Sequence, residues 1–182
     1  MNKAFIYKDT LVGDIAIAEE EGFITHLLFL NAANSSVYLN DSDILYDSAI
    51  LYDFAIIHDF AIIEETVLIK KAKQQLDEYF IGNRNTFLLP LKPRGSAFQM
   101  KVWEALQKIP YGETRSYKEI GEQIGNPKAS RAVGHANNRN PISIIIPCHR
   151  VIGSNGQLIG YGGGIDIKEK LLSLEGEYTN KE

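Results

Sequence analysis

The chain has 182 residues, 45% of them apolar and 23% charged, which is enough to bury one sizeable core or two small ones. Its apolar stretches are too short for a membrane helix and its first residues hold no signal-peptide core, so we expect a cytoplasmic protein that binds no membrane. A single cysteine, Cys148, excludes an internal disulfide, and with four histidines it forms no spaced zinc pattern, so no metal or other cofactor is expected.

The net charge of -4 hides an uneven distribution along the chain. Residues 1–90 carry 6 basic and 14 acidic side chains, whereas residues 91–182 carry 13 basic and 9 acidic ones. The excess is sharpest between Lys92 and Arg150, with 10 basic and 4 acidic side chains. We therefore expect the second half to face a polyanion such as nucleic acid, and the first half to face away from it.

The first part of the chain predicts strands. Alternating apolar residues indicate an antiparallel meander of three strands, at 4–7, 14–17 and 24–29. A hexapeptide is then written three times over residues 46–63. Three copies are too few for a stacked β-helix, so we interpret them as a local duplication that is tolerated in a connection.

From Glu65 the pattern changes to that of a helix. Apolar residues recur at three- and four-residue steps as far as Phe80, and Gly82 follows where a helix would end. A short strand is expected at 87–89, before a Pro- and Gly-rich linker at 90–95. We place the domain boundary in this linker, which gives an α/β domain at 1–92 and a second domain at 93–182.

The second domain begins with two capping boxes. Ser96-Ala-Phe-Gln99 predicts the start of a helix that Pro110 stops, and Ser116-Tyr-Lys-Glu119 predicts the start of a shorter one. Gly125-Asn-Pro127 then separates it from another helix over 128–136, with proline in its first turn. Two short helices across a glycine turn indicate a helix-turn-helix, here in the most basic part of the chain.

Small residues dominate the second of these two helices. It carries one long cation, Arg131, among Ala129, Ser130, Ala132, Gly134 and Ala136. A helix this slim could enter a narrow groove of DNA and insert the arginine as a wedge.

An apolar run up to Ile146 predicts a strand that delivers Cys148 to a turn. A lone cysteine is most often a small buried hydrophobe, but a neighbouring base or cation can lower the thiol pKa and make it reactive. His149 and Arg150 are the candidates, although adjacent side chains on a strand point apart, so His149 needs a turn or a bridging water. Glu175, at the end of an expected last helix over 168–174, could orient His149 or simply be a solvated charge.

These residues resemble the O6-alkylguanine-DNA alkyltransferases, also called methylated-DNA–protein-cysteine methyltransferases. The resemblance is dense from Phe98 to Gly176, through Val102-Trp103, Ile109-Pro-Tyr-Gly-Glu-Thr114, Ser116-Tyr117, Arg131-Ala-Val-Gly134, Asn140-Pro141, Ile146-Pro-Cys-His-Arg-Val151, Gly160-Tyr161 and Leu174-Glu175-Gly176. It implies a ribonuclease H-like α/β first domain and a mainly α, winged-helix-like second domain with a helix-turn-helix. The hexapeptide repeat has no counterpart in the family.

The resemblance also implies roles for the residues around the cysteine. Cys148 is then the alkyl acceptor, His149 the base reached through water, and Glu175 the carboxylate that orients the histidine. Asn140 holds the turn before the cysteine. Tyr117 promotes flipping of the nucleotide and donates to the guanine ring.

Base and DNA contacts follow in the same way. The base is expected to meet Val151, Tyr161, Gly162, Gly163 and Lys168. DNA contacts are expected of Ser116, Ala129, Arg131, Ala132, Gly134 and Arg150. The partner is then double-stranded DNA that carries O6-alkylguanine, with O4-alkylthymine left open, approached from the minor groove by a monomer. Zinc is not expected, because the chain lacks the cysteines that hold it in the first domain of metal-bearing relatives.

Three other functions remain open from the residues alone. A non-catalytic, alkyltransferase-like lesion-binding protein has the same framework with tryptophan in place of the cysteine. A helix-turn-helix regulator would bind one undamaged sequence. A cysteine hydrolase with Cys148, His149 and Glu175 as its triad would turn over acyl substrates.

Overall fold

The computed structural model describes residues 3–30 and 62–179. The first two hexapeptide copies and all but the end of the third lie outside these residues, so the interpretation of the repeat as a tolerated insertion stays a prediction. Within the described part of the chain, no helix is both long and apolar enough to cross a membrane.

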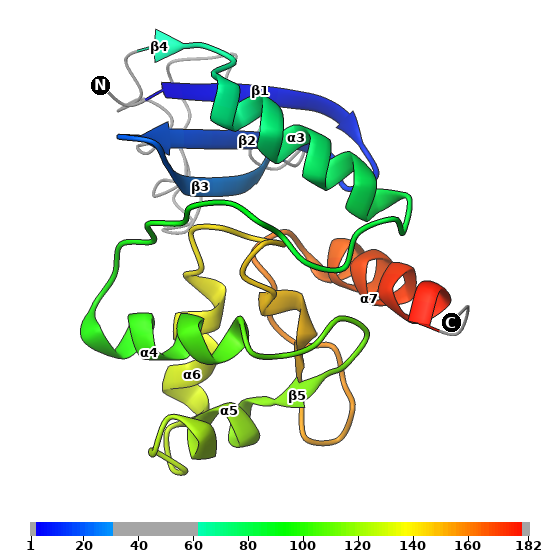
Figure 1. The fold of residues 1–182 in the computed structure, drawn as a ribbon. Coiled ribbons are helices and arrows are strands. Elements are labelled where there is room, and N and C mark those ends of the chain that lie inside the picture. Colours follow the sequence, from blue (N-terminus) through cyan, green and yellow to red (C-terminus); the bar gives the residue numbers. More distant parts are fainter. Residues whose placement is uncertain (1–2, 31–61, 180–182) are drawn as a thin grey trace, which may run out of the picture.

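A four-stranded sheet forms the first domain (Figure 1). The predicted antiparallel meander is confirmed as β1 (Lys3–Thr10), β2 (Gly13–Glu20) and β3 (Phe23–Leu30). The short strand β4 (Ile62–Ile63) pairs parallel with β1, so the strand order is β3-β2-β1-β4.

Helix α3 (Val67–Phe80) packs on one face of this sheet. The Thr66 side chain caps its start by accepting from Ile69 N, and Gly82, with a φ of 75°, follows its end. Its buried stripe, Ile69, Ala72 and Leu76, meets the apolar side chains of β2 and β3 in one core. The apolar residues that recur every three or four positions in the sequence therefore form the face that the helix buries.

No strand forms at 87–89, contrary to expectation. The side chain of Gln75 takes both backbone groups of Leu88: Oε1 accepts from Leu88 N at 2.8 Å, and Nε2 donates to Leu88 O at 3.3 Å. The linker pairs with the sheet a little later, where Ile24 N donates to Pro90 O and Lys92 N donates to Ile24 O.

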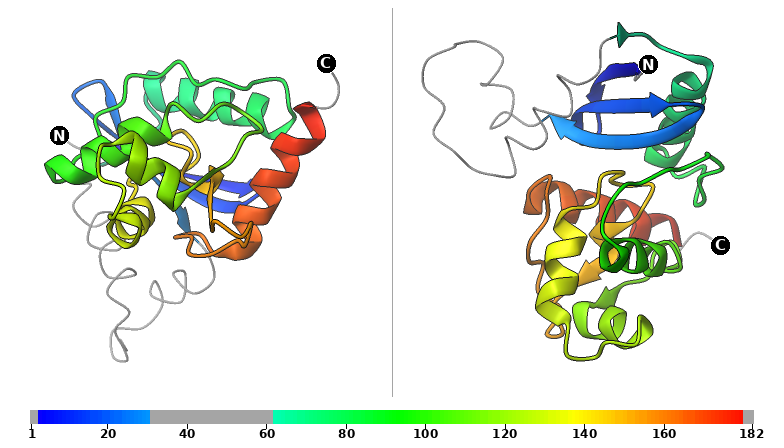
Figure 2. Two further views of the ribbon diagram at one scale, coloured as in Figure 1. Left: turned by 90° about the horizontal axis from the view of Figure 1, so that it is seen from below. Right: turned by 90° about the vertical axis from the view of Figure 1, so that its left-hand side faces the viewer.

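The second domain is built mainly of helices. These are α4 (Ala97–Leu106), α5 (Tyr117–Gln123), α6 (Ser130–Asn138) and α7 (Ile165–Thr179), with a two-residue parallel pair, β5 (Arg115–Ser116) and β6 (Val151–Ile152). Both capping boxes are present, and α5 and α6 pack as the predicted helix-turn-helix. The structure therefore confirms the expected fold class, and Figure 2 shows the sheet layer stacked on the helical domain.

Three boundaries differ from expectation. Helix α6 begins at Ser130, because a turn closed by Ala129 N and Asn126 O precedes it, so the proline lies outside the helix. The apolar run before the cysteine is not a strand: Ile142 forms an isolated bridge and the chain then turns, with Ile144 at a φ of 68°. Helix α7 is longer than 168–174, so Glu175 lies within it.

Strand β3 also joins the two domains. Leu27 N donates to Pro141 O at 2.8 Å, and Ser143 N donates to Leu27 O at 3.0 Å. The segment that leads to the cysteine is thereby fixed to the edge of the first domain.

Candidate active site

Cys148 begins a short 3-10 helix, η2 (Cys148–Arg150), and only 3% of the residue is exposed. Asn140 supports it from the preceding loop. Its Nδ2 donates to Ile146 O at 2.7 Å and to Cys148 Sγ at 3.1 Å, while its Oδ1 accepts from Ile142 N at 3.0 Å. One amide side chain therefore fixes both ends of the turn and contacts the sulfur.

Burial raises the pKa of the Cys148 thiol above its ordinary value. The hydrogen bond from Asn140, the positive charge of Lys168 and the Tyr161 hydroxyl favour the thiolate but do not outweigh burial. The thiol is therefore protonated at neutral pH, and a base has to take its proton when it reacts.

His149, the next residue, is fully buried and paired with a carboxylate. Its Nε2 lies 2.8 Å from Oε1 of Glu175. Burial lowers the pKa of His149 despite this partner, so the ring is neutral at neutral pH. A neutral ring that donates from Nε2 has its lone pair on Nδ1, and no hydrogen bond to Nδ1 forms within residues 3–30 and 62–179.

Glu175 is the centre of a buried network. Its carboxylate accepts from His149, from Nε and Nη2 of Arg150 at 2.9 Å each, from Tyr79 OH at 2.7 Å and from Gly112 N at 3.2 Å. Burial would raise the pKa of Glu175, but His149 and Arg150 outweigh it and lower that pKa to about 2. Glu175 is thus a buried partner of His149, which resolves the choice that spacing alone left open.

The expectation that Arg150 contacts DNA is corrected by the structure. Its guanidinium is buried, with Nε and Nη2 on Glu175 and Nη1 donating to Ile109 O at 2.7 Å. All three nitrogens are occupied inside the protein. Arg150 therefore holds the carboxylate and does not reach the surface.

The helix-turn-helix faces a cavity of about 590 Å³. Tyr117, Arg131, Gly134, Asn138 and Gly160 are among its lining residues. The Tyr117 ring packs beside Gly134: a Cβ atom at this glycine would lie 3.6 Å from the ring, an ordinary van der Waals contact.

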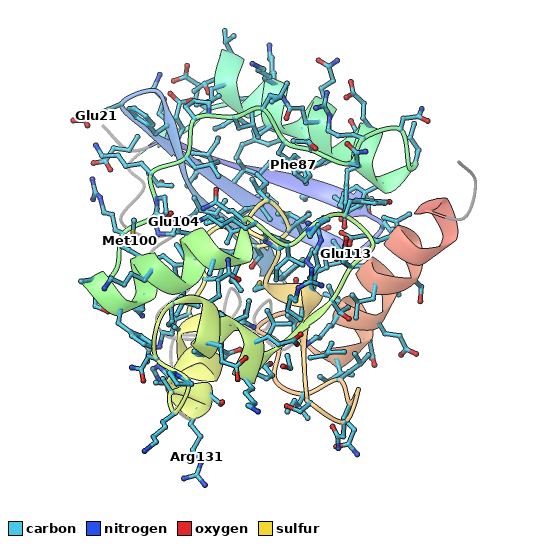
Figure 3. The ribbon with its side chains drawn as sticks, turned by 60° about the horizontal axis from the view of Figure 1, so that its bottom comes forward. Glu21, Phe87, Met100, Glu104, Glu113 and Arg131 are labelled. Carbon is cyan, nitrogen blue, oxygen red and sulfur yellow. The ribbon has the colours of Figure 1, made fainter. Side chains whose placement is uncertain are left out.

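Arg131 points outward from this cavity wall. Its side chain is exposed and projects from the end of the molecule away from the sheet (Figure 3). Ala132 is exposed beside it, and Ala129 and Ser116 are partly exposed at the starts of α6 and α5. The residues predicted to meet DNA, Arg150 excepted, thus gather at the helix-turn-helix.

A small cavity of about 40 Å³ is lined by Cys148, Asn138 and Gly162 among others. The carbonyl oxygen of Ile159 accepts two hydrogen bonds, from Tyr117 OH at 2.8 Å and from Lys168 Nζ at 3.1 Å. Tyr117 on α5 and Lys168 on α7 therefore bind the same carbonyl oxygen.

Lys168 is fully buried and also donates to Val151 O at 2.6 Å. Burial lowers the pKa of Lys168 to about 8. Two of the five residues predicted to contact the base, Lys168 and Val151, are therefore brought together, with the Val151 carbonyl accepting from the lysine.

The predicted lid, Tyr161 and Gly162-Gly-Gly164, packs on the first domain. The rings of Tyr161 and Phe29 have centroids 5.7 Å apart. A Cβ atom at Gly163 would lie 2.6 Å from Phe29 Cδ2, so only glycine fits there. Strand β3 therefore supports the lid as well as the segment before the cysteine.

Sequence reasoning missed three supporting residues. Asn137 Nδ2 donates to Cys148 O at 3.2 Å, Trp103 Nε1 donates to Ala136 O at 2.9 Å and so fixes α6, and Tyr79 reaches Glu175 from the first domain. Each of these side chains lies in a helix among apolar or helix-end residues, and its hydrogen-bond partner is distant in the sequence. Only the fold shows which partner it contacts. In the part of the chain that the structure describes, no three His, Cys, Asp or Glu side chains group to hold a metal ion.

Two family models match the chain, one in each half. Residues 4–93 match the family model "6-O-methylguanine DNA methyltransferase, ribonuclease-like domain", and residues 97–177 match "6-O-methylguanine DNA methyltransferase, DNA binding domain". A methylated-DNA–protein-cysteine methyltransferase of Methanosarcina acetivorans is 64% identical over 107 residues, 59% of this chain and 69% of that protein. The constitutive one of Bacillus subtilis is 46% identical over 168 residues, 92% of each chain.

Solved structures are similar as well. The crystal structure of the Mycobacterium tuberculosis O6-methylguanine methyltransferase matches with a TM-score of 0.80 at 40% identity, over 98% of this chain and 94% of that one. A Mycobacterium tuberculosis structure in complex with DNA matches with a TM-score of 0.77 at 39% identity, over 97% and 94%.

Proposed function

We propose, from the premise that this chain belongs to the 6-O-methylguanine DNA methyltransferase family, that Cys148 is the residue onto which it transfers the alkyl group. Its activity is that of a methylated-DNA–protein-cysteine methyltransferase, which repairs DNA by direct reversal of damage, and DNA is its partner. The observation that carries the proposal for Cys148 is the buried pair beside it: His149 keeps Nε2 on Glu175 and so offers Nδ1 as a base.

The reaction is an in-line displacement at a saturated carbon. The sulfur of Cys148 forms a bond to the alkyl carbon while the bond from that carbon to guanine O6 breaks, and the thiol proton passes through a water to His149 Nδ1. The guanine leaves as an anion, accepts a hydrogen bond from Tyr117 as the proposed donor, and takes up one proton from water. Burial raises the pKa of Tyr117, so its hydroxyl stays protonated and can donate this hydrogen bond.

The product limits each molecule to one turnover. A thioether at Cys148 is not hydrolysed by water under mild conditions, and the chain has no other cysteine. The protein therefore acts stoichiometrically.

A stacked nucleotide cannot bring its alkyl group to a buried thiol, so it has to leave the duplex at a cost of a few kcal/mol. We propose that α6 approaches the minor groove and that Arg131 enters the space of the flipped nucleotide, since its exposed side chain stands on a helix of small residues. The Val151 carbonyl and the lid, Tyr161 and Gly162-Gly-Gly164, would then hold the base, with Lys168 beside it. We also propose a monomer, a domain boundary at 92/93 and a cytoplasmic location.

The test is chemical. Incubation with a duplex that carries methyl-labelled O6-methylguanine should leave one methyl group per protein on the Cys148 peptide. Cys148→Ala should abolish transfer while keeping DNA binding. Repair by the alanine variant would overturn the proposal.

A lesion-binding protein without transfer activity is not favoured, because the cysteine that such proteins replace with tryptophan is present at 148. Turnover of acyl substrates would instead support a hydrolase. Tight binding to one undamaged sequence, with no preference for a lesion, would support a regulator.

A further inference from the structure

We propose that Tyr79, a residue of the first domain, is a positioning residue for the base: its hydroxyl group bonds to the carboxylate of Glu175 and thereby tunes His149. This inference rests on the proposed function of Cys148 and His149, and it assigns part of the chemistry to a domain whose sheet and helix otherwise only support the site.

The contact is short and buried. Tyr79 OH donates to Glu175 Oε1 at 2.7 Å, across 96 positions of sequence, and the tyrosine is fully buried. The same oxygen accepts from His149 Nε2 at 2.8 Å and from Arg150 Nη2 at 2.9 Å. The Tyr79 hydroxyl and the His149 ring therefore both donate to Oε1 of Glu175 and share its negative charge.

Packing holds the hydroxyl in place. The Tyr79 ring lies in a cluster of aromatic rings, with centroid distances of 5.7 Å to Phe80, 5.4 Å to Phe87 and 6.1 Å to Tyr111. Burial first, and then the adjoining carboxylate, raise the pKa of Tyr79 well above its ordinary value. It therefore acts as a hydrogen-bond donor throughout the range in which the histidine titrates.

The physical effect has a definite sign. Each donor on Oε1 withdraws part of the negative charge that stabilises a protonated His149. Without the Tyr79 hydroxyl, the carboxylate would attract the imidazolium more strongly and the pKa of His149 would rise. The other titratable and charged groups around the pair stay unchanged: Arg150 and Cys148 on η2, Lys168 on α7, Tyr111 after α4 and Tyr161 in the lid.

Tyr79→Phe in the full-length protein tests this, because it removes one oxygen and keeps the ring. The rate constant of methyl transfer to Cys148 is measured in single turnover from about pH 5 to pH 8. We expect the acid limb of the profile to move to higher pH by about half a unit, a loss of about threefold on that limb. The rate above the limb should change much less.

Phe87→Leu is the matched control, since it alters packing on the same ring without touching Glu175. It should leave the position of the acid limb unchanged. A Tyr79→Phe profile that falls equally at every pH, or one that coincides with the wild type, would overturn the inference and leave Tyr79 a packing residue.

A second measurement does not depend on repair. The ring of His149 can be titrated by NMR in the wild type and in Tyr79→Phe, without any alkylated DNA. A higher pKa in the variant supports the coupling even if methyl transfer to Cys148 fails its own test. Equal pKa values in the two proteins overturn it even if transfer succeeds.

Discussion

In the proposed function Cys148 reacts although its surroundings favour the protonated thiol. Burial raises its pKa, and the Asn140 amide that contacts the sulfur offsets only part of this. The arrangement suits a nucleophile that is used once, because a thiolate exposed at all times would react with other electrophiles. Under the proposed mechanism, His149 takes the proton only when the thiol reacts with its substrate.

Glu175 makes stability depend on pH, and the sign follows from its lowered pKa. The folded value is about 2 and the ordinary value is 4.5. Its contribution is therefore complete above pH 4.5 and is lost as the pH falls from 4.5 towards 2, a change of about 3 kcal/mol in the free energy of unfolding.

We therefore expect Glu175→Gln to be less stable than the wild type at pH 7 by about 3–5 kcal/mol, because it leaves Arg150 buried without its charge partner. The difference should shrink as the pH approaches 2. Urea unfolding at several pH values measures it. Glu113→Gln, which breaks an exposed pair with Arg115, should differ little from the wild type at any pH; a Glu175→Gln difference that is constant with pH would contradict the assignment.

Arg131 is expected to matter only for duplex DNA. A nucleotide in a duplex has to be extruded, whereas a free O6-alkylguanine base does not. Arg131→Ala should therefore slow transfer from a duplex by at least tenfold, about 1.4 kcal/mol, and leave transfer from the free base nearly unchanged. Lys101→Ala removes an exposed charge from α4 and serves as the control for general electrostatics. Equal losses on both substrates for Arg131→Ala would mean that the arginine does not act in flipping.

At the scale of elements, the helices could be predicted well because their signals are local. Ser96 and Ser116 each form the capping box that their spacing indicated. The strands of the meander alternate in a way that one buried face requires. The resemblance of the Pro-Cys-His-Arg region also located Cys148 and its partners.

The wrong secondary-structure predictions share a cause. In each case a side chain or a distant segment forms the hydrogen bonds that a neighbouring strand was expected to form. The side chain of Gln75 binds the backbone N and O of Leu88, so no strand forms there. The apolar run before Cys148 has the pattern of a strand. Its backbone bonds to β3 only through residues 141 and 143, and the chain turns after them. Neither Tyr79 on Glu175 nor the inward turn of Arg150 has any local signal, since both partners lie in another element.

The lid offers a test of contact between elements. Gly163→Ala would place a methyl group 2.6 Å from the Phe29 ring, so the lid or β3 must shift, and we expect transfer from both duplex and free base to slow by at least tenfold. Phe29→Leu, which is smaller at this point, should reduce the penalty in the double variant. Strictly additive effects in this double-mutant cycle would show that the two residues do not clash.

At the scale of the whole molecule, the basic and acidic halves occupy different domains. The acidic sheet domain lies away from Arg131, which stands at the far end of the helical domain. Such a distribution orients the protein toward a polyanion while its net charge stays negative.

Alkylation should destabilise the fold. Cys148 is 3% exposed and its sulfur contacts Asn140, so an added methyl group has to enter a packed interior. We expect methylation to lower the free energy of unfolding by about 1–3 kcal/mol and so to lower the Tm. Calorimetry before and after stoichiometric reaction measures the change. Cys148→Ser incubated with the same DNA should keep its Tm. An unchanged Tm on methylation would show that the site has spare room.

The bonds along β3 have a consequence for self-association. A sheet edge with free amide and carbonyl groups is a template on which other chains can add strands. Here one edge strand, β3, is covered by the protein's own linker and by the loop before Cys148, through Ile24 and Leu27. Loosening of the helical domain would uncover this edge, so damage to the repair site and a tendency to aggregate are expected to arise together.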